Sequence, residues 1–267
     1  MSTKEQRTAE SSEPASAGIR SFPVTTMGEF FDALSKVDRV MGRCRTWWRG
    51  QAKQEWKVQP SLYHMGKIRD EVSMNLRFRS LAGIRYVSPP ASDDLPGWLL
   101  LMQHYGIPTR LLDWTRSPLI ALLFAVEEEQ DSGGTVWGLS PGLLNERQIG
   151  TREMPVADDW RVSGVFESAF RGNKTAHSDK IIAFPAPHTD LRQMIQASEF
   201  TIHGVPQPLD EDPNAGEFLV RIDVPSTAKE DLKDSLELLG IVREDLFPDL
   251  EHLAEEIKSR PFVDTQE

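Results

Sequence analysis

The 267-residue sequence has a single cysteine, Cys44, and no hydrophobic run long enough to cross a membrane. A membrane-spanning helix needs about 20 consecutive apolar residues, and the most apolar stretches here are interrupted by charged or imidazole side chains. One cysteine cannot build a disulfide framework or a cysteine zinc site, so the predicted compartment is a reducing cytoplasm. The polar first 18 residues lack the apolar core of a secretory signal. Together these absences exclude the membrane, secreted and zinc-ribbon classes.

Basic side chains are scarce towards the end of the chain. Residues 210–267 hold 6 basic and 17 acidic side chains, whereas residues 1–209 hold 24 of each, so the net charge of −11 comes from the C-terminal part. Residues 43–85 carry ten basic side chains against three acidic ones. That excess is compatible with an anionic ligand, although scattered surface charge explains it equally well. The acidic C-terminal surface disfavours nucleic acid as a partner.

Hydrophobic periodicity and turn signals predict a single mixed α+β domain over residues 22–260, between disordered tails at 1–21 and 261–267. One predicted helix begins at Ser117, with Pro118 in its first turn. The other predicted helices cover 26–38, 69–86, 95–105, 189–197, 227–239 and 247–259. In the predicted helix at 69–86, the apolar spacing predicts that Val72, Leu76 and Leu81 are buried. The predicted strands cover 44–50, 109–115, 134–140, 179–186, 199–205 and 217–224.

Two blocks of residues carry groups suited to chemistry. In the first, Trp48-Arg49-Gly50-Gln51, an arginine leaves a strand beside a glycine turn. Such an arginine presents a planar fork of donors to a phosphate or carboxylate, and the glycine leaves room for close approach. The alternative is a structural arginine that ties down a carboxylate or backbone carbonyls.

The second block, residues 103–118, places polar side chains among apolar residues that are predicted to be buried. Buried polar groups must be paired, so the block is either a rigid hydrogen-bond network or a lined pocket. His104 alone is typical of a core histidine, and Arg110 with Asp113 is typical of a buried ion pair. The strand-to-helix turn at 114–118 adds free backbone N–H groups that can bind an anion.

Several segments resemble the FRG-domain family. They are WWRGQ, W-x-x-x-P-S-L at 56–62, QHYGIPTRLLDWTRSPLIALLFAV at 103–126, FTIHG at 200–204 and LGI…LFPDLEHLAEEI at 239–257. The family's aromatic-Arg-Gly motif is met as Trp48-Arg49-Gly50, with tryptophan in place of the usual phenylalanine or tyrosine. The resemblance extends over residues 24–260.

The order of these motifs is similar to that of ADP-ribosyltransferases, which implies a largely antiparallel central sheet flanked by helices. The resemblance implies that Arg49 holds the diphosphate or ribose of NAD. It assigns Thr115-Arg116-Ser117 to the strand end that shapes the nicotinamide-ribose pocket. It also implies a Gln/Glu-x-Glu motif, for which the candidates are Gln196 and Glu199.

Glu199 stands one residue later than that motif requires, and one step along a strand turns a side chain to the opposite face. Cleavage of the nicotinamide glycosidic bond builds positive charge on the ribose, which a nearby carboxylate must stabilise. Either a bulge brings Glu199 into the site, or another carboxylate is needed. Asp113 can substitute if it faces the cleft.

Three functions remain open at this point. The first is an enzyme that transfers ADP-ribose from NAD or hydrolyses NAD, with a protein target as a further partner and no metal. The second is a non-catalytic module that senses a nucleotide or a partner in bacterial stress or phage defence. The third is a nuclease-like activity centred on His104 and Asp113, with His203, for which the sequence offers few clustered carboxylates.

The predicted site consists of three candidate catalytic residues and seven candidate ligand-binding residues, expected to converge on one cleft. The catalytic candidates are Glu199, Gln196 and His104, and the ligand-binding candidates are Arg49, Gly50, Gln51, Arg110, Asp113, Thr115 and Ser117. The leucine spacing of residues 227–259 predicts that the C-terminal helices pack on the same domain.

Overall fold

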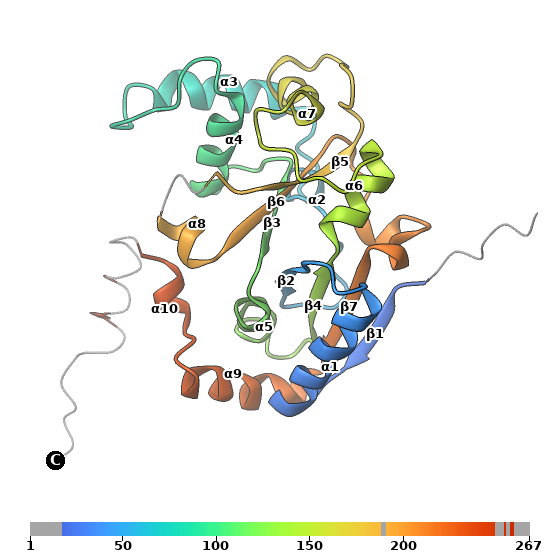
Figure 1. Cartoon of the computed structure of the whole chain (residues 1–267). Helices are drawn as coiled ribbons and strands as arrows, with labels where there is room; N and C mark the ends of the chain where they lie inside the picture. The colour runs from blue at the N-terminus through green and yellow to red at the C-terminus, as the bar shows by residue number, and fades with distance from the viewer. Residues whose placement is uncertain (1–17, 188–190, 249–253, 255–256, 259–267) are drawn as a thin grey trace, which may run out of the picture.

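The centre of the molecule is a seven-stranded mixed sheet, shown in the computed structural model, which describes residues 18–187, 191–248, 254 and 257–258 (Figure 1). The strand order is β1-β7-β4-β2-β3-β6-β5, and every neighbouring pair is antiparallel except β1 with β7. The strands are β1 (Arg20–Pro23), β2 (Trp47–Gln51), β3 (Leu111–Thr115), β4 (Gly134–Leu139), β5 (Ile181–Pro185), β6 (Ser198–His203) and β7 (Leu219–Val224). The expected α+β class with a largely antiparallel sheet is confirmed.

Helices of very different lengths surround this sheet. They are α1 (Met27–Val40), α2 (Ser61–His64), α3 (Glu71–Ala82), α4 (Leu95–His104), α5 (Pro118–Val126), α6 (Pro141–Ile149), α7 (Trp160–Arg171), α8 (Leu191–Ile195), α9 (Lys229–Leu238) and α10 (Arg243–Leu246). Three 3₁₀ turns, Leu209–Glu211, Ala215–Glu217 and Ser226–Ala228, complete the described part. No helix in that part is long and apolar enough to cross a membrane.

Two groups of helices cover one face of the sheet. Helices α1, α5 and α9 share a core with β4 and β7, in which Val136, Val220 and Ile222 are fully buried. Helices α4 and α7 share a second core with β3, β5 and β6, centred on Phe166 and Ile202. In Figure 1, α3, α4 and α7 gather at one end of the molecule and α1 and α9 at the other.

The opposite face of the sheet carries a third core. Trp47, Trp114 and Trp137 lie there, against Leu144 of α6 and Phe218 beside the second 3₁₀ turn. Helix α6 also protects the outer edge of β5, because the Asn145 side chain donates to the Ala183 carbonyl and accepts from the Ala183 N–H, each at 2.8 Å. The amide thus replaces a strand partner at an edge that would otherwise be open.

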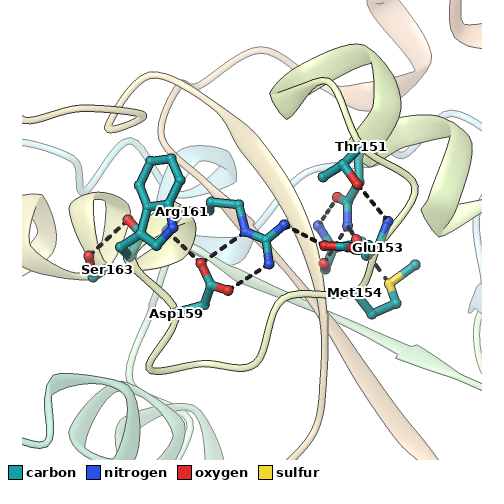
Figure 2. Close-up of polar contacts among 9 residues, drawn as sticks. Thr151, Glu153, Met154, Asp159, Arg161 and Ser163 are labelled. Carbon is teal, nitrogen blue, oxygen red and sulfur yellow. Dashed lines mark hydrogen bonds and ion pairs between the residues drawn. The ribbon is translucent and has the colours of Figure 1, made fainter.

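The loop between α6 and α7 is held by a small ionic network (Figure 2). The Arg161 guanidinium donates to both oxygens of Asp159, at 2.9 and 2.6 Å, and to Glu153 at 2.9 Å. Hydrogen bonding from Arg161 holds the pKa of Asp159 below its usual value. Asp159 therefore contributes stability above its unfolded-state pKa, and that contribution is lost as the pH falls through its folded-state pKa.

Most predicted elements are confirmed, and the differences have identifiable places in the chain. The sequence predicted Val72, Leu76 and Leu81 to be buried, but Leu76 and Leu81 are exposed on α3 and Val72 is only partly buried. The buried α3 side chains are instead Glu71 and Asn75, because the polar contacts of the helix face the protein interior. Strand β1 starts at Arg20, within the predicted N-terminal tail, and pairs with β7. Helices α2, α6, α7 and α10 were not predicted. Most of the predicted helix at 247–259 and the tail at 261–267 lie outside the described residues.

The C-terminal helices contribute to the first core. Leu232, Leu236 and Leu246 are buried in the core that contains α5. The Lys229 ammonium is also buried, and it donates to the carbonyls of Ala52, Glu128 and Glu129 at 2.7, 2.8 and 3.0 Å. Helix α9 is thus attached both by apolar packing and by a cation that serves three carbonyls.

Truncation after Val224 tests this integration. We expect the product to lose cooperative thermal unfolding or to aggregate, because burial of several large apolar side chains is removed and each contributes about 1.5–3 kcal/mol. The measurement is a thermal melt followed by circular dichroism, with truncation after Lys258 as the control. A soluble fragment ending at Val224 that melts at the wild-type temperature would show that the C-terminal segment is a separate tail.

Candidate functional site

A cleft of about 370 Å³ opens on the sheet where β2 and β3 diverge, between α4 and α5. Seven of the ten predicted site residues line it. The predicted residues that line it are Arg49, Gly50, Gln51, His104, Asp113, Thr115 and Gln196. Arg49, the 109–117 strand and turn, and the 196–203 strand therefore converge as predicted, although 147 positions separate Arg49 from Gln196.

The cleft exists because β2 and β3 are paired at only one position, Trp48 opposite Thr115. Beyond that pair, the Arg49 side chain bridges the strands, and its Nη1 donates to the Asp113 carbonyl at 2.8 Å. Its buried Nε has no hydrogen-bond partner among the described residues. Burial lowers the pKa of Arg49, and the charge of Asp113 opposes that shift. Arg49 thus serves the strand pairing and also faces the cleft.

Gly50 allows α5 to lie directly on β2. A Cβ at Gly50 would lie 1.9 Å from the Ala121 carbonyl oxygen and 2.8 Å from the Cβ of Phe124. No side chain fits such a distance, so the glycine of the Trp-Arg-Gly motif is required by the packing of α5. This contact sets the wall of the cleft that carries Phe124.

Asp113 is an exposed residue at the centre of an otherwise buried strand, and it lines the cleft. Its Oδ2 accepts a hydrogen bond of 2.6 Å from Nε2 of Gln103 on α4. His104, the last residue of α4, lines the same cleft, and its ring meets the Tyr105 ring edge-on at a centroid distance of 5.0 Å. His104 and Asp113 therefore line one cleft, of which Arg49 on β2 is also a lining residue.

The strand-to-helix turn after β3 is held by its own hydroxyl groups. The Thr115 hydroxyl donates to the Gln196 carbonyl at 2.6 Å and accepts from the Ser117 N–H at 3.0 Å. Ser117 is the predicted N-cap of α5, accepting from the Ile120 N–H at 3.4 Å, and it does not line the cleft. The Gln196 amide donates to the Leu246 carbonyl at 3.0 Å, so it holds α10 to this wall.

Glu199 lies on the other face of the sheet from the cleft. Ser198 is opposite Thr115 in the strand register and lines the cleft, whereas Glu199 is opposite Trp114 and does not. The Glu199 carboxylate accepts from the Ala186 N–H at 3.2 Å and lies 3.5 Å from Nε of Arg116. No bulge restores the spacing, and Asp113 is the aspartate that faces the cleft.

Arg110 also lies outside the cleft. Its guanidinium is buried, forms a bidentate ion pair with Glu71 of α3 and donates to Ser168 of α7 at 2.7 Å. Burial by itself would lower the pKa of Arg110, but the contacts with Glu71 outweigh it and raise that pKa. The expected ion pair with Asp113 does not form, since Arg110 ties β3 to two helices instead.

Four charged residues of the cleft were missed by the sequence reasoning: Arg192, Arg243, Glu127 and Glu128. Arg243 of α10 donates to Glu127 at 2.8 Å and to Glu128 at 3.1 Å, across the mouth of the cleft from α5. Arg192 lies four residues before Gln196, and on a helix this spacing places two side chains on the same face. The sequence could therefore have predicted Arg192 as a site residue from its spacing to Gln196. No motif or spacing near Arg243 in the sequence indicated that it would line the cleft.

Comparison with known families bears on this geometry. Residues 44–133 match the FRG domain. No curated protein and no solved structure matches the chain. The FRG segment contains the Trp-Arg-Gly motif, Gln103, His104, Asp113 and helix α5, and therefore most of the cleft wall. The β6 strand and α10, with the FTIHG and LGI…LFPDL segments, lie outside the match.

The arrangement suits a small anionic ligand with an aromatic group. Trp48, Trp56 and Phe124 supply aromatic surface. Arg49 and Arg192 supply positive charge, whereas Arg243 is paired with Glu127 and Glu128, which also line the cleft. Aromatic rings stack on flat heterocycles, and guanidinium groups bind phosphate or carboxylate. Within the described residues, His, Cys, Asp and Glu side chains do not form a group of three or more suited to a metal ion.

The ion pair between Arg110 and Glu71 is predicted to stabilise the fold, and a substitution at Glu71 tests this structural role. We expect Glu71→Gln to lower the free energy of unfolding by about 3–5 kcal/mol, because it leaves a buried guanidinium without its counter-charge. The matched control is Glu146→Gln, which removes the exposed pair with Arg152 and costs about 1 kcal/mol or less. Chemical denaturation measures both, and equal stabilities of the two variants would contradict the structural role.

Proposed function

We propose that the cleft of this FRG domain binds a nucleotide-type ligand, with NAD as the candidate, and that Asp113 promotes cleavage of its nicotinamide glycosidic bond. The observation that carries the proposal is that Asp113, an exposed carboxylate residue, and Arg49 line the same cleft. A nucleotide offers a negative charge for the arginine and a developing positive charge for the carboxylate.

Recognition would depend on residues from three segments. Arg49, which lines the cleft from β2, would meet the ligand phosphates. Trp56 and Phe124 provide flat apolar surface for a base or nicotinamide ring. The volume of about 370 Å³ lies within the range of small-molecule sites.

The chemistry would proceed through an oxocarbenium-like transition state. The bond between ribose C1′ and the nicotinamide nitrogen breaks, and its electron pair leaves with nicotinamide. Asp113 stabilises the positive charge that develops on the sugar. Water or an acceptor side chain of a protein target then attacks C1′ and loses its proton, with His104 as the nearby group suited to take it.

A non-catalytic sensing function is the second candidate, and one observation favours it. The Asp113 carboxylate already accepts from Gln103 at 2.6 Å, and Arg49 already donates to the Asp113 carbonyl at 2.8 Å. Asp113 and Arg49 therefore both take part in hydrogen bonds that stabilise the fold, and a binding module without turnover needs such contacts too. The nuclease-like alternative gains no support, because His203 lies on the Trp114 face of the sheet, fully buried, where desolvation lowers its pKa to about 3.

The setting follows as part of the same proposal. A single cysteine agrees with a reducing cytoplasm. The resemblance noted for the FRG motifs suggests bacterial stress or phage defence, in which consumption of NAD or modification of a protein target would have a direct effect.

Asp113→Asn tests turnover separately from binding. We expect the variant to bind NAD with an affinity close to wild type and to release nicotinamide on the order of 10²-fold more slowly, because the amide is neutral. Calorimetry measures binding and chromatography measures nicotinamide. Binding without nicotinamide release by the wild type would favour the sensing function, and absence of binding would refute both.

Arg49→Lys tests the proposed contact between Arg49 and the phosphates of NAD. Lysine is a point donor that cannot form a bidentate contact, so NAD affinity should fall by about 1–3 kcal/mol. A thermal melt must accompany the titration, because Arg49 also bridges β2 and β3. Equal NAD affinities of the folded wild type and variant would rule out Arg49 as the anchor.

A further inference from the structure

A second hollow, separate from the cleft, runs along α3. This groove has a volume of about 580 Å³ and is walled on one side by α3 and on the other by the connection between α4 and β3. Its apolar lining comprises Met74, Phe78, Leu81, Ala82, Tyr86, Tyr105, Ile107 and Pro108. None of the residues that line the cleft belongs to this set.

The groove presents apolar surface that the described part of the chain leaves open to solvent. Leu81 is 42% exposed and Tyr105 is 56% exposed. Ile84 and Val87, which lie between α3 and α4 in the sequence, are 81% and fully exposed. A contiguous exposed patch of this kind marks an interaction surface, because single scattered apolar residues do not gather in one hollow.

The shape of the groove fits a helix. Met74, Phe78 and Leu81 follow one another at helical intervals of four and three residues and so form a single stripe along α3. The Tyr86 and Tyr105 rings, in edge contact at 6.2 Å, form part of the lining beside that stripe. An apolar groove lined by such a stripe is the kind of surface into which an amphipathic helix inserts its apolar side chains.

The charge around the groove specifies the partner further. Arg77 and Arg85 line it, and no aspartate or glutamate does. The Arg85 Nη1 donates to the Leu81 carbonyl at 2.9 Å, whereas Arg77 has no hydrogen bond or ion pair within the described part of the chain. Both belong to the basic segment 43–85. A helix with acidic residues beside its apolar stripe would meet both arginines.

We propose that this groove is a docking site for an acidic amphipathic helix of a partner protein. The inference is independent of the ligand in the cleft, since no groove residue lines the cleft. An apolar trough does not favour nucleic acid, whose phosphates would be desolvated against it. The two arginines distinguish an acidic helix from a basic one of the same apolar pattern.

The experiment uses the full chain and two labelled synthetic helical peptides. Both carry leucine at the same helical positions, one with glutamate and the other with lysine on the flanking positions. We expect fluorescence anisotropy to show binding of the glutamate peptide at least ~10-fold tighter than of the lysine peptide, because only the former complements Arg77 and Arg85.

Variants locate the binding. Leu81→Asp and Arg77→Glu should each weaken the glutamate peptide by at least ~10-fold, and neither should unfold the protein because both positions are exposed. Leu238→Asp, at an 89% exposed position on α9, is the matched control and should bind like wild type. Asp113→Asn should also bind the peptide normally, which separates this test from that of the cleft.

Three results would overturn the proposal. They are absence of glutamate-peptide binding at about 100 μM, equal binding of the two peptides, and binding that Leu81→Asp does not alter. Dodecanoate serves as a further probe: if it binds in a Leu81-dependent way while the acidic peptide does not, the groove is a site for small apolar anions and the helix proposal fails.

Discussion

The single paired position between β2 and β3 is the constraint on which the candidate site depends. Strand β2 pairs with β4 along its whole length and β3 pairs with β6 along its whole length, yet the two halves of the sheet meet only at Trp48 and Thr115. A break of this kind at the centre of a sheet exposes backbone groups that need partners. Arg49 supplies one of them by donating to the Asp113 carbonyl, and the space that remains is the cleft.

The helices keep that space open because they pack as two separate groups. Gly50 lets α5 lie against β2 so closely that the α1-α5-α9 core stays on one side of the break. Arg110 draws β3 towards α3 and α7 on the other side through its contacts with Glu71 and Ser168. Arg49 and Arg110 were both predicted to bind the ligand, but they differ in role. Arg49 lines the cleft, whereas Arg110 connects β3 to α3 and α7.

The sequence predicted those features that have local causes. The Ser117 cap with Pro118, the apolar α4 and the buried β3 strand each follow from a few neighbouring residues, and the structure confirms them. Alternation also places Asp113 and Thr115 on the same side of β3. It turns Arg49 to the side opposite Trp48, however, so the place of Arg49 in the cleft wall does not follow from alternation. Long-range pairings could not be read in this way. The partner of Arg110 lies 39 positions away on α3, and Arg243 reaches Glu127 from 116 positions further along the chain.

Helix α3 shows why periodicity alone fails at an interaction surface. Apolar spacing predicts a buried stripe, and Leu76 and Leu81 were assigned to it, but α3 buries Glu71 and Asn75 because Arg110 and the Ala169 carbonyl need polar partners. The cost of leaving those groups unpaired exceeds what burial of one leucine returns. The helix is therefore oriented by its polar contacts, and its leucines are left at the surface. An apolar stripe that the core buries only in part, beside Arg77 and Arg85, has the composition of a surface that is completed by another molecule.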